Sequence, residues 1–134
     1  MEKLRNILHV DDAEDIRMII KITLEMVGGY HVDQFASGQE AVEQAADTTP
    51  QLFLLDFMMP DMDGMETWTA LRELPGFADV PAIFVTAKAE ENFSQSMLEK
   101  GALSVITKPF DPIELCAKIE TAWAAHKEQA STAD

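Results

Sequence analysis

Four short apolar runs, each followed by polar residues, constrain the fold of this chain more than any other feature. Each run is long enough for a buried strand, and the stretches between them are long enough for helices. The runs are residues 7–10 before Asp11 and Asp12, 52–55 before Asp56, 82–85 before Thr86, and 103–106 before Lys108. Parallel strands place their carboxyl ends at one edge of a sheet, where open α/β sheets bind ligands. The pattern therefore predicts one polar site assembled from four strand ends.

Strands and helices are expected to alternate along the whole chain. Nearly continuous apolar strands are typical of a parallel sheet covered by helices on both faces, and strand–helix–strand units imply right-handed crossovers. We predict one five-fold (βα) domain over residues 1–126 and a short flexible tail over 127–134. The predicted strands are about 5–10, 30–35, 52–55, 82–85 and 103–106, and the predicted helices are about 14–27, 37–47, 65–74, 90–100 and 112–126.

Composition narrows the classes of function. The chain has 134 residues, 47% of them hydrophobic, and no apolar stretch long enough to span a bilayer. Its polar N-terminus is unlike a signal peptide, so a cytoplasmic protein is expected. The net charge of −14 argues against direct nucleic-acid contact, which needs Lys and Arg. The single cysteine, Cys116, excludes an intramolecular disulfide and is expected to be a small core residue.

The predicted site has the groups that phosphoryl transfer to a carboxylate requires. Carboxylate oxygens at one sheet edge suit Mg²⁺, and an aspartate can act as a nucleophile toward phosphorus. Asp56 is the better nucleophile candidate, because Asp11 and Asp12 share one strand end and suit the cation. Lys108 can neutralise charge on a phosphoryl oxygen, and Thr86 can donate a hydrogen bond. Each residue alone could be structural; their joint placement favours function.

Four motifs, in this order, make the chain resemble a response-regulator receiver domain of two-component signalling over about residues 6–125. The resemblance implies a flavodoxin-like sheet of order 2-1-3-4-5 and a signalling switch rather than a metabolic enzyme, limited to self-catalysed phosphotransfer and autodephosphorylation. The motifs are Val10-Asp11-Asp12, Leu55-Asp56 with Met59-Pro60 and Asp63-Gly64, Val85-Thr86-Ala87, and Thr107-Lys108-Pro109-Phe110.

The resemblance also implies a role for each site residue. Asp56 would accept a phosphoryl group from a phosphohistidine on a histidine kinase or a histidine phosphotransfer protein. Asp12, Asp56 and the backbone carbonyl of Met58 would bind Mg²⁺, with Asp11 acting mostly through a metal-bound water. Thr86 and Lys108 would contact the phosphoryl group. A stand-alone receiver would then act on a protein effector, without direct nucleic-acid contact or membrane insertion; the alternative is a phosphorelay intermediate that passes the group onward.

The chain departs from the family pattern at a few positions. Receivers usually carry an aromatic residue where Val105 stands, so signalling is expected to use another element, such as the helix at 90–100, or a weaker switch. Met58 offers no general base beside the acceptor and Lys88 could shield the phosphoryl group, which predicts a long-lived phospho-form.

The first helix carries two apolar stripes, one more than a core-facing helix needs. Residues 16, 20, 24 and 27 fit a buried stripe, and a second stripe at i, i+4, i+8 is formed by residues 18, 22 and 26. The second stripe is either a wide buried face or a docking patch for the phosphodonor, because exposed methionines often bind partner helices.

Three other classes fit the residues less well. An aspartyl-phosphate phosphohydrolase needs a second acid where Met58 stands, and a cap domain for substrate. A nucleotide- or flavin-binding protein of similar topology needs a Gly-rich loop after its first strand, where this chain has Asp11 and Asp12. A pseudo-receiver that only binds partners would not need the full set of acceptor and supporting residues.

Overall fold

The computed structural model describes residues 3–87 and 91–132. Over these residues strands and helices alternate in the predicted order. The elements are β1 Asn6–Val10, α1 Glu14–Met26, β2 His31–Phe35, α2 Gly38–Gln44, the 3₁₀ turn η1 Ala45–Asp47, β3 Leu52–Asp56, α3 Gly64–Arg72, β4 Ala82–Thr86, α4 Glu91–Glu99, β5 Ser104–Thr107 and α5 Pro112–Thr132.

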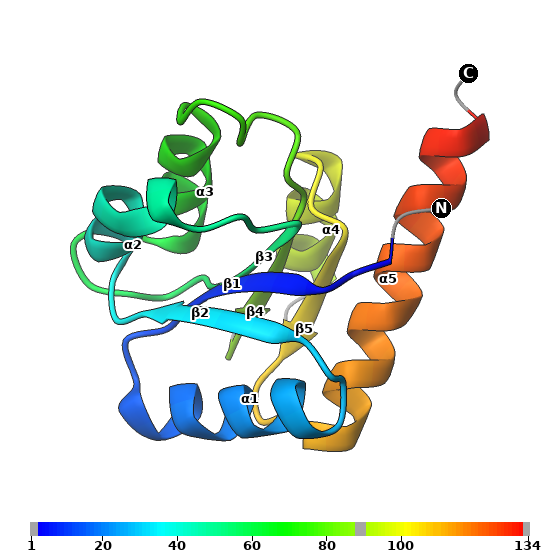
Figure 1. Cartoon of the computed structure of the whole chain (residues 1–134), viewed down its shortest axis with the longest axis horizontal. Helices are drawn as coiled ribbons and strands as arrows, with labels where there is room; N and C mark the ends of the chain where they lie inside the picture. The colour runs from blue at the N-terminus through cyan, green and yellow to red at the C-terminus, as the bar shows by residue number, and fades with distance from the viewer. Residues whose placement is uncertain (1–2, 88–90, 133–134) are drawn as a thin grey trace.

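The five strands form one parallel sheet in the order β2-β1-β3-β4-β5. Helices α1 and α5 cover one face of this sheet, and α2, α3 and α4 cover the other (Figure 1). The predicted fold class, a doubly wound flavodoxin-like (βα)₅ sheet, is therefore confirmed. Because all strands are parallel, the carboxyl ends of β1, β3, β4 and β5 meet at one edge.

Each face of the sheet has its own apolar core, because every strand sends alternate side chains to opposite sides. Leu54 and Ile83 contribute to the core beneath α1 and α5, where Cys116 is also buried as expected. Phe53 and Phe84 contribute to the core beneath α2, α3 and α4. All residues of β3 and β4 are buried, as strands covered on both faces must be.

One helix end differs from the sequence prediction. At the start of α2 the Ser37 hydroxyl accepts from the Glu40 N–H, and the Glu40 carboxylate accepts from the Ala36 N–H. Helix α5 does not end near residue 126 but continues to Thr132. The residue types from 127 to 130 are Lys, Glu, Gln and Ala, which all favour helix. The domain boundary at residue 126 stays a prediction.

Helix α1 exposes most of its second apolar stripe. Met18, Ile22 and Met26 are 59%, 53% and 81% exposed, so of the two alternatives the wide buried face is wrong, and an apolar patch lies open to solvent. Ile20 and Leu24 are buried as predicted. Val27 was expected in the buried stripe but is exposed, because it is the C-cap of α1 and lies past the last turn that packs on the sheet.

In the described part of the chain, no helix combines the length and apolar character needed to cross a membrane.

Candidate phosphorylation site

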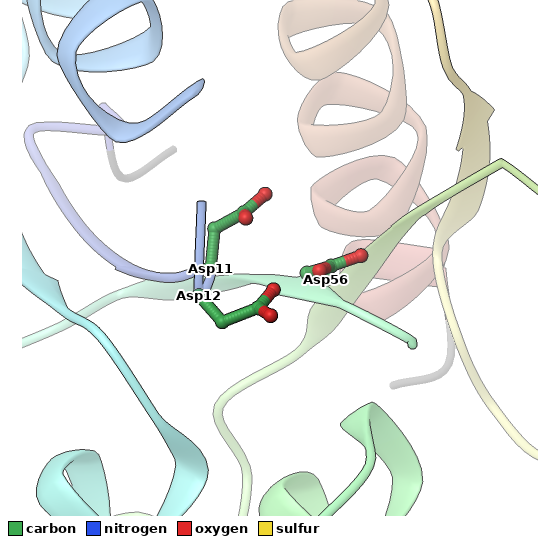
Figure 2. A group of neighbouring side chains, drawn as sticks. All are labelled: Asp11, Asp12 and Asp56. Carbon is green, nitrogen blue, oxygen red and sulfur yellow. The ribbon is translucent and has the colours of Figure 1, made fainter. Parts of the chain in front are cut away.

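The three predicted carboxylates meet at the carboxyl edge of the sheet (Figure 2). Asp11 and Asp12 follow β1, and Asp56 is the last residue of β3. One oxygen from each carboxylate lies within 4.8 Å of the others. Asp11 and Asp56 are buried, whereas Asp12 is exposed. The site therefore has a deep part held by the strand ends and an open side at Asp12.

Lys108 lies between the two buried carboxylates. Its Nζ is 3.0 Å from Asp11 Oδ2 and 3.3 Å from Asp56 Oδ1. Burial alone would lower the pKa of Lys108, but its hydrogen bond to Asp11 and the negative charges of Asp11 and Asp56 outweigh that effect and raise the pKa. Lys108 is thus a fixed positive charge, joined to the rest of the site through β5. The Lys108–Pro109 peptide bond is cis.

The environment of Asp56 disfavours its charged form. Burial is the main cause, the negative charge of Asp11 adds to it, and the positive charge and hydrogen bond of Lys108 offset them only in part. The pKa of Asp56 is raised from 3.8 to about 6. Mutual repulsion of this kind is relieved when a cation joins the carboxylates.

Thr86 and Met58 complete the predicted set. Thr86 ends β4 and is fully buried, and its carbonyl accepts from the Lys108 N–H at 2.8 Å, which ties β4 to the segment that carries the lysine. Met58 lies in the loop after β3, with its side chain 61% exposed. Phosphoryl contacts of Thr86 and metal binding by the Met58 carbonyl stay predictions. Lys88 lies outside the described residues.

The start of α3 is packed directly against the acceptor strand. The Gly64 N–H donates to the carbonyl of Phe57 at 2.8 Å. A Cβ at Gly64 would lie 2.8 Å from both the Asp56 carbonyl oxygen and the Phe57 Cα, so only glycine fits there. Asp63 and Glu66 form a reciprocal capping box that fixes the first turn of α3. The loop after Asp56 is therefore anchored at its far end by α3.

A part of the site that the sequence analysis missed lies behind Asp11. The Asp11 carboxylate accepts from the Ala13 N–H at 2.9 Å, and the Asp11 backbone carbonyl accepts from Arg17 Nη1 at 2.7 Å. Both contacts are local in sequence, but they depend on how the chain turns from β1 into α1. The sequence signal that could have indicated this contact is Arg17, a basic residue in the first turns of an otherwise apolar helix.

Val105 packs, partly buried, against the core beneath α2, α3 and α4, opposite Phe84 in the β4–β5 register. The ring nearest to the acceptor in sequence is Phe57, directly after Asp56. Its centroid lies 5.9 Å from that of Phe84 and 4.7 Å from that of Phe93, both in edge-to-face geometry. Because Phe93 belongs to α4, these contacts join the loop after the acceptor to α4, the element that sequence analysis named as an alternative route for the signal.

The donor set fits a hard divalent cation. All three grouped side chains offer carboxylate oxygens, which Mg²⁺ prefers, and the exposed side at Asp12 leaves space for the waters that Mg²⁺ retains. Asp11, Asp12 and Asp56 are the residues that would hold it.

Comparison with known proteins agrees with this geometry. The model of the family described as "Response regulator receiver domain" matches residues 7–120. The chain belongs to the response regulator receiver domain family. Receiver domains are signalling switches of two-component systems, and they interact with histidine kinases and effectors.

Curated relatives and solved structures place the receiver in context. The phosphate regulon transcriptional regulatory protein PhoB of Pseudomonas aeruginosa is 40% identical over 116 residues, covering 87% of this chain and 50% of PhoB. The transcriptional regulatory protein SrrA of Staphylococcus aureus is 39% identical over 114 residues, covering 85% and 46%. The chain thus spans about half the length of the curated relatives it matches.

Two solved receivers are similar along nearly their whole length. The chemotaxis protein CheY4 of Vibrio cholerae has a TM-score of 0.80 at 28% identity, covering 90% of this chain and 99% of that one. A CheY-like receiver domain protein from Methanospirillum hungatei has a TM-score of 0.76 at 34% identity, covering 94% and 99%.

Proposed function

We propose that this receiver accepts a phosphoryl group on Asp56 from a phosphohistidine of a histidine kinase or histidine phosphotransfer protein, and thereby switches its protein–protein contacts. An Asp56 carboxylate oxygen attacks phosphorus, the phosphorus–nitrogen bond of the donor breaks, and the released imidazole nitrogen takes up a proton. The observation that carries the proposal is the buried Asp56 carboxylate, held between Lys108 and the Asp11–Asp12 strand end.

The residues around Asp56 have separate roles in this reaction. When bound at Asp11, Asp12 and Asp56, Mg²⁺ supplies positive charge that offsets the carboxylates and the incoming phosphoryl oxygens. Lys108, already 3.3 Å from Asp56, turns from the carboxylates to a phosphoryl oxygen. Thr86 donates its hydroxyl hydrogen to another. Phosphorylation thus adds negative charge at Asp56 that draws Thr86 and Lys108 toward the acceptor, and the switch depends on this movement.

Several parts of the sequence prediction remain predictions. They are the cytoplasmic location, the stand-alone role, the lack of nucleic-acid contact, the long-lived phospho-form and the onward phosphorelay. Onward transfer would use the same acceptor, so it adds a partner and leaves the site chemistry unchanged.

Phosphorylation from a small donor tests the acceptor. After incubation with acetyl phosphate and Mg²⁺, we expect intact-mass analysis to find one phosphoryl adduct on the native chain. The Asp56→Asn variant should carry none, since an amide cannot attack phosphorus. Asp47→Asn, which removes an exposed aspartate from η1, is the matched control and should be phosphorylated normally. An equal adduct on Asp56→Asn would refute the assignment.

The exposed stripe on α1 is proposed to dock the phosphodonor. Met18→Glu with Ile22→Glu places charges on a patch that is more than half exposed, so the fold should be retained. We expect at least tenfold slower phosphotransfer from a phosphorylated kinase but an unchanged rate from acetyl phosphate, which needs no docking surface. Leu98→Glu on α4, 43% exposed, is the control. Equal slowing with both donors would show damage to the site instead of lost docking.

A further inference from the structure

Behind the acidic site, three side chains form a chain of hydrogen bonds that joins β1, β2 and α1. Arg17 of α1 donates from Nη1 to the backbone carbonyl of Asp11 at 2.7 Å. Gln34 of β2 donates from Nε2 to the Arg17 carbonyl at 2.7 Å, and the same Nε2 lies 3.0 Å from His9 Nδ1. His9 is in β1, two residues before Asp11. These hydrogen bonds therefore run from His9 in β1 through β2 and α1 back to Asp11, the residue directly after β1.

His9 is held in this chain at a cost to stability. A side-chain amide nitrogen only donates, so His9 Nδ1 accepts and the ring proton sits on Nε2. His9 is fully buried, and Nε2 has no hydrogen-bond partner among the described residues. A buried donor without a partner destabilises a fold, although His9 Nδ1 also supplies an acceptor for Gln34 Nε2. A residue that costs stability at this place points to a function.

These hydrogen bonds hold the turn between β1 and α1, which carries Asp11 and Asp12. Helix α1 begins at Glu14, and its N-cap, Ala13, directly follows the two aspartates and makes no side-chain capping hydrogen bond. The Asp11 carboxylate is engaged by the Ala13 N–H and by Lys108, while its backbone carbonyl is held by Arg17. If Arg17 moves, the turn that sets the distance between Asp11, Asp12 and Asp56 moves as well.

We propose that His9 and Gln34 are positioning residues that act through Arg17 to hold the β1–α1 turn in the geometry that binds Mg²⁺. Gln34 fixes the first turns of α1 through the Arg17 carbonyl, and His9 fixes the Gln34 side chain. The inference rests on the proposed metal site at Asp11, Asp12 and Asp56, and it adds residues that touch neither the metal nor the phosphoryl group.

Calorimetric titration with Mg²⁺, paired with thermal unfolding without added Mg²⁺, separates positioning from simple packing. For His9→Leu we expect an unfolding midpoint close to that of the native chain, because removal of the unpaired His9 donor offsets the lost acceptor of Gln34 Nε2, together with about threefold to tenfold weaker Mg²⁺ binding. Arg17→Gln should weaken binding at least as much, and Arg17→Lys should restore part of it. The double variant His9→Leu with Arg17→Gln should bind Mg²⁺ no more weakly than Arg17→Gln alone, because both substitutions break the same series of hydrogen bonds.

The control is Arg72→Gln, which removes an arginine stacked on Trp68 of α3, far along the chain from the site. It should leave the Mg²⁺ affinity within twofold of native. Unchanged Mg²⁺ affinity in His9→Leu, beside a native chain that binds Mg²⁺, would overturn the positioning role and leave the proposed function standing. A native chain that binds no Mg²⁺ would overturn the metal site and this inference together.

Discussion

Replacing Lys108 by methionine is expected to lower the free energy of unfolding by about 2–3 kcal/mol at pH 8 without added Mg²⁺. Lys108 is within 3.3 Å of two buried carboxylates, and its removal leaves both charges buried together. The loss should shrink on acidification, because protonating the carboxylates removes the repulsion. Added Mg²⁺ should raise the midpoint of thermal unfolding more for the variant than for the native chain, because the Lys108 ammonium no longer competes with Mg²⁺ for the carboxylates. Phosphorylation of the variant should be slower than that of the native chain. Chemical denaturation at several pH values measures the loss of stability, and thermal unfolding with and without Mg²⁺ measures the effect of the cation.

Lys118→Met is the matched control for this experiment. Lys118 is an exposed lysine of α5 that takes no part in the acidic site. It should change the free energy of unfolding by less than about 0.5 kcal/mol. If Lys108→Met costs no more than Lys118→Met, the lysine does not hold the carboxylates together and its assigned role fails.

Replacing Asp56 by asparagine is expected to stabilise the chain at neutral pH, although it removes the acceptor. The folded pKa of Asp56 is about 6, above its ordinary value of 3.8, so the folded state binds more protons than the unfolded state between these values. Native stability therefore falls as pH rises from about 4 to 6 and stays low above that range. Asn carries no charge, so the variant should be about 1–3 kcal/mol more stable at pH 7.5 and equal to native below pH 4.

Denaturation of native chain and Asp56→Asn at matched pH values, without added Mg²⁺, tests this dependence. The difference in free energy of unfolding between the two proteins should grow as the pH rises from 4 to 6, and it should shrink when Mg²⁺ stabilises the native form. Asp47→Asn controls for the loss of one exposed negative charge. If Asp56→Asn is less stable than the native chain at pH 7.5, the charged form of Asp56 is not disfavoured in the folded state and the account is contradicted.

The parts of the site that sequence could predict are those that chain direction alone determines. Four strand ends at one edge follow from parallel pairing, so the sequence alone predicts that Asp56, Thr86 and Lys108 lie near Asp11 and Asp12. The apolar runs also predicted both covered faces of the sheet, because an alternating pattern would have indicated one exposed face.

The parts that sequence missed depend on how neighbouring elements pack. The hydrogen bond from Arg17 to the Asp11 carbonyl depends on the exact path of the turn into α1. That His9 Nε2 meets no acceptor in the described part of the chain depends likewise on how β1 and its neighbours pack. Periodicity assigned Val27 to the buried stripe of α1, but α1 ends at Met26 and Val27 is its C-cap. Tertiary geometry decides such contacts, whereas local pattern decides only which face a residue lies on.

Locating the phosphoryl group on the chain tests the central claim most directly. The receiver would be phosphorylated by a phosphohistidine donor in Mg²⁺ and treated at once with borohydride, which reduces an acyl phosphate of aspartate to homoserine. Tandem mass spectrometry of the digested chain then reads the modified position. The account predicts homoserine at position 56 and at no other aspartate. Homoserine at position 11 or 12, or a phosphoryl group on a serine, threonine or histidine with Asp56 unmodified, would contradict it.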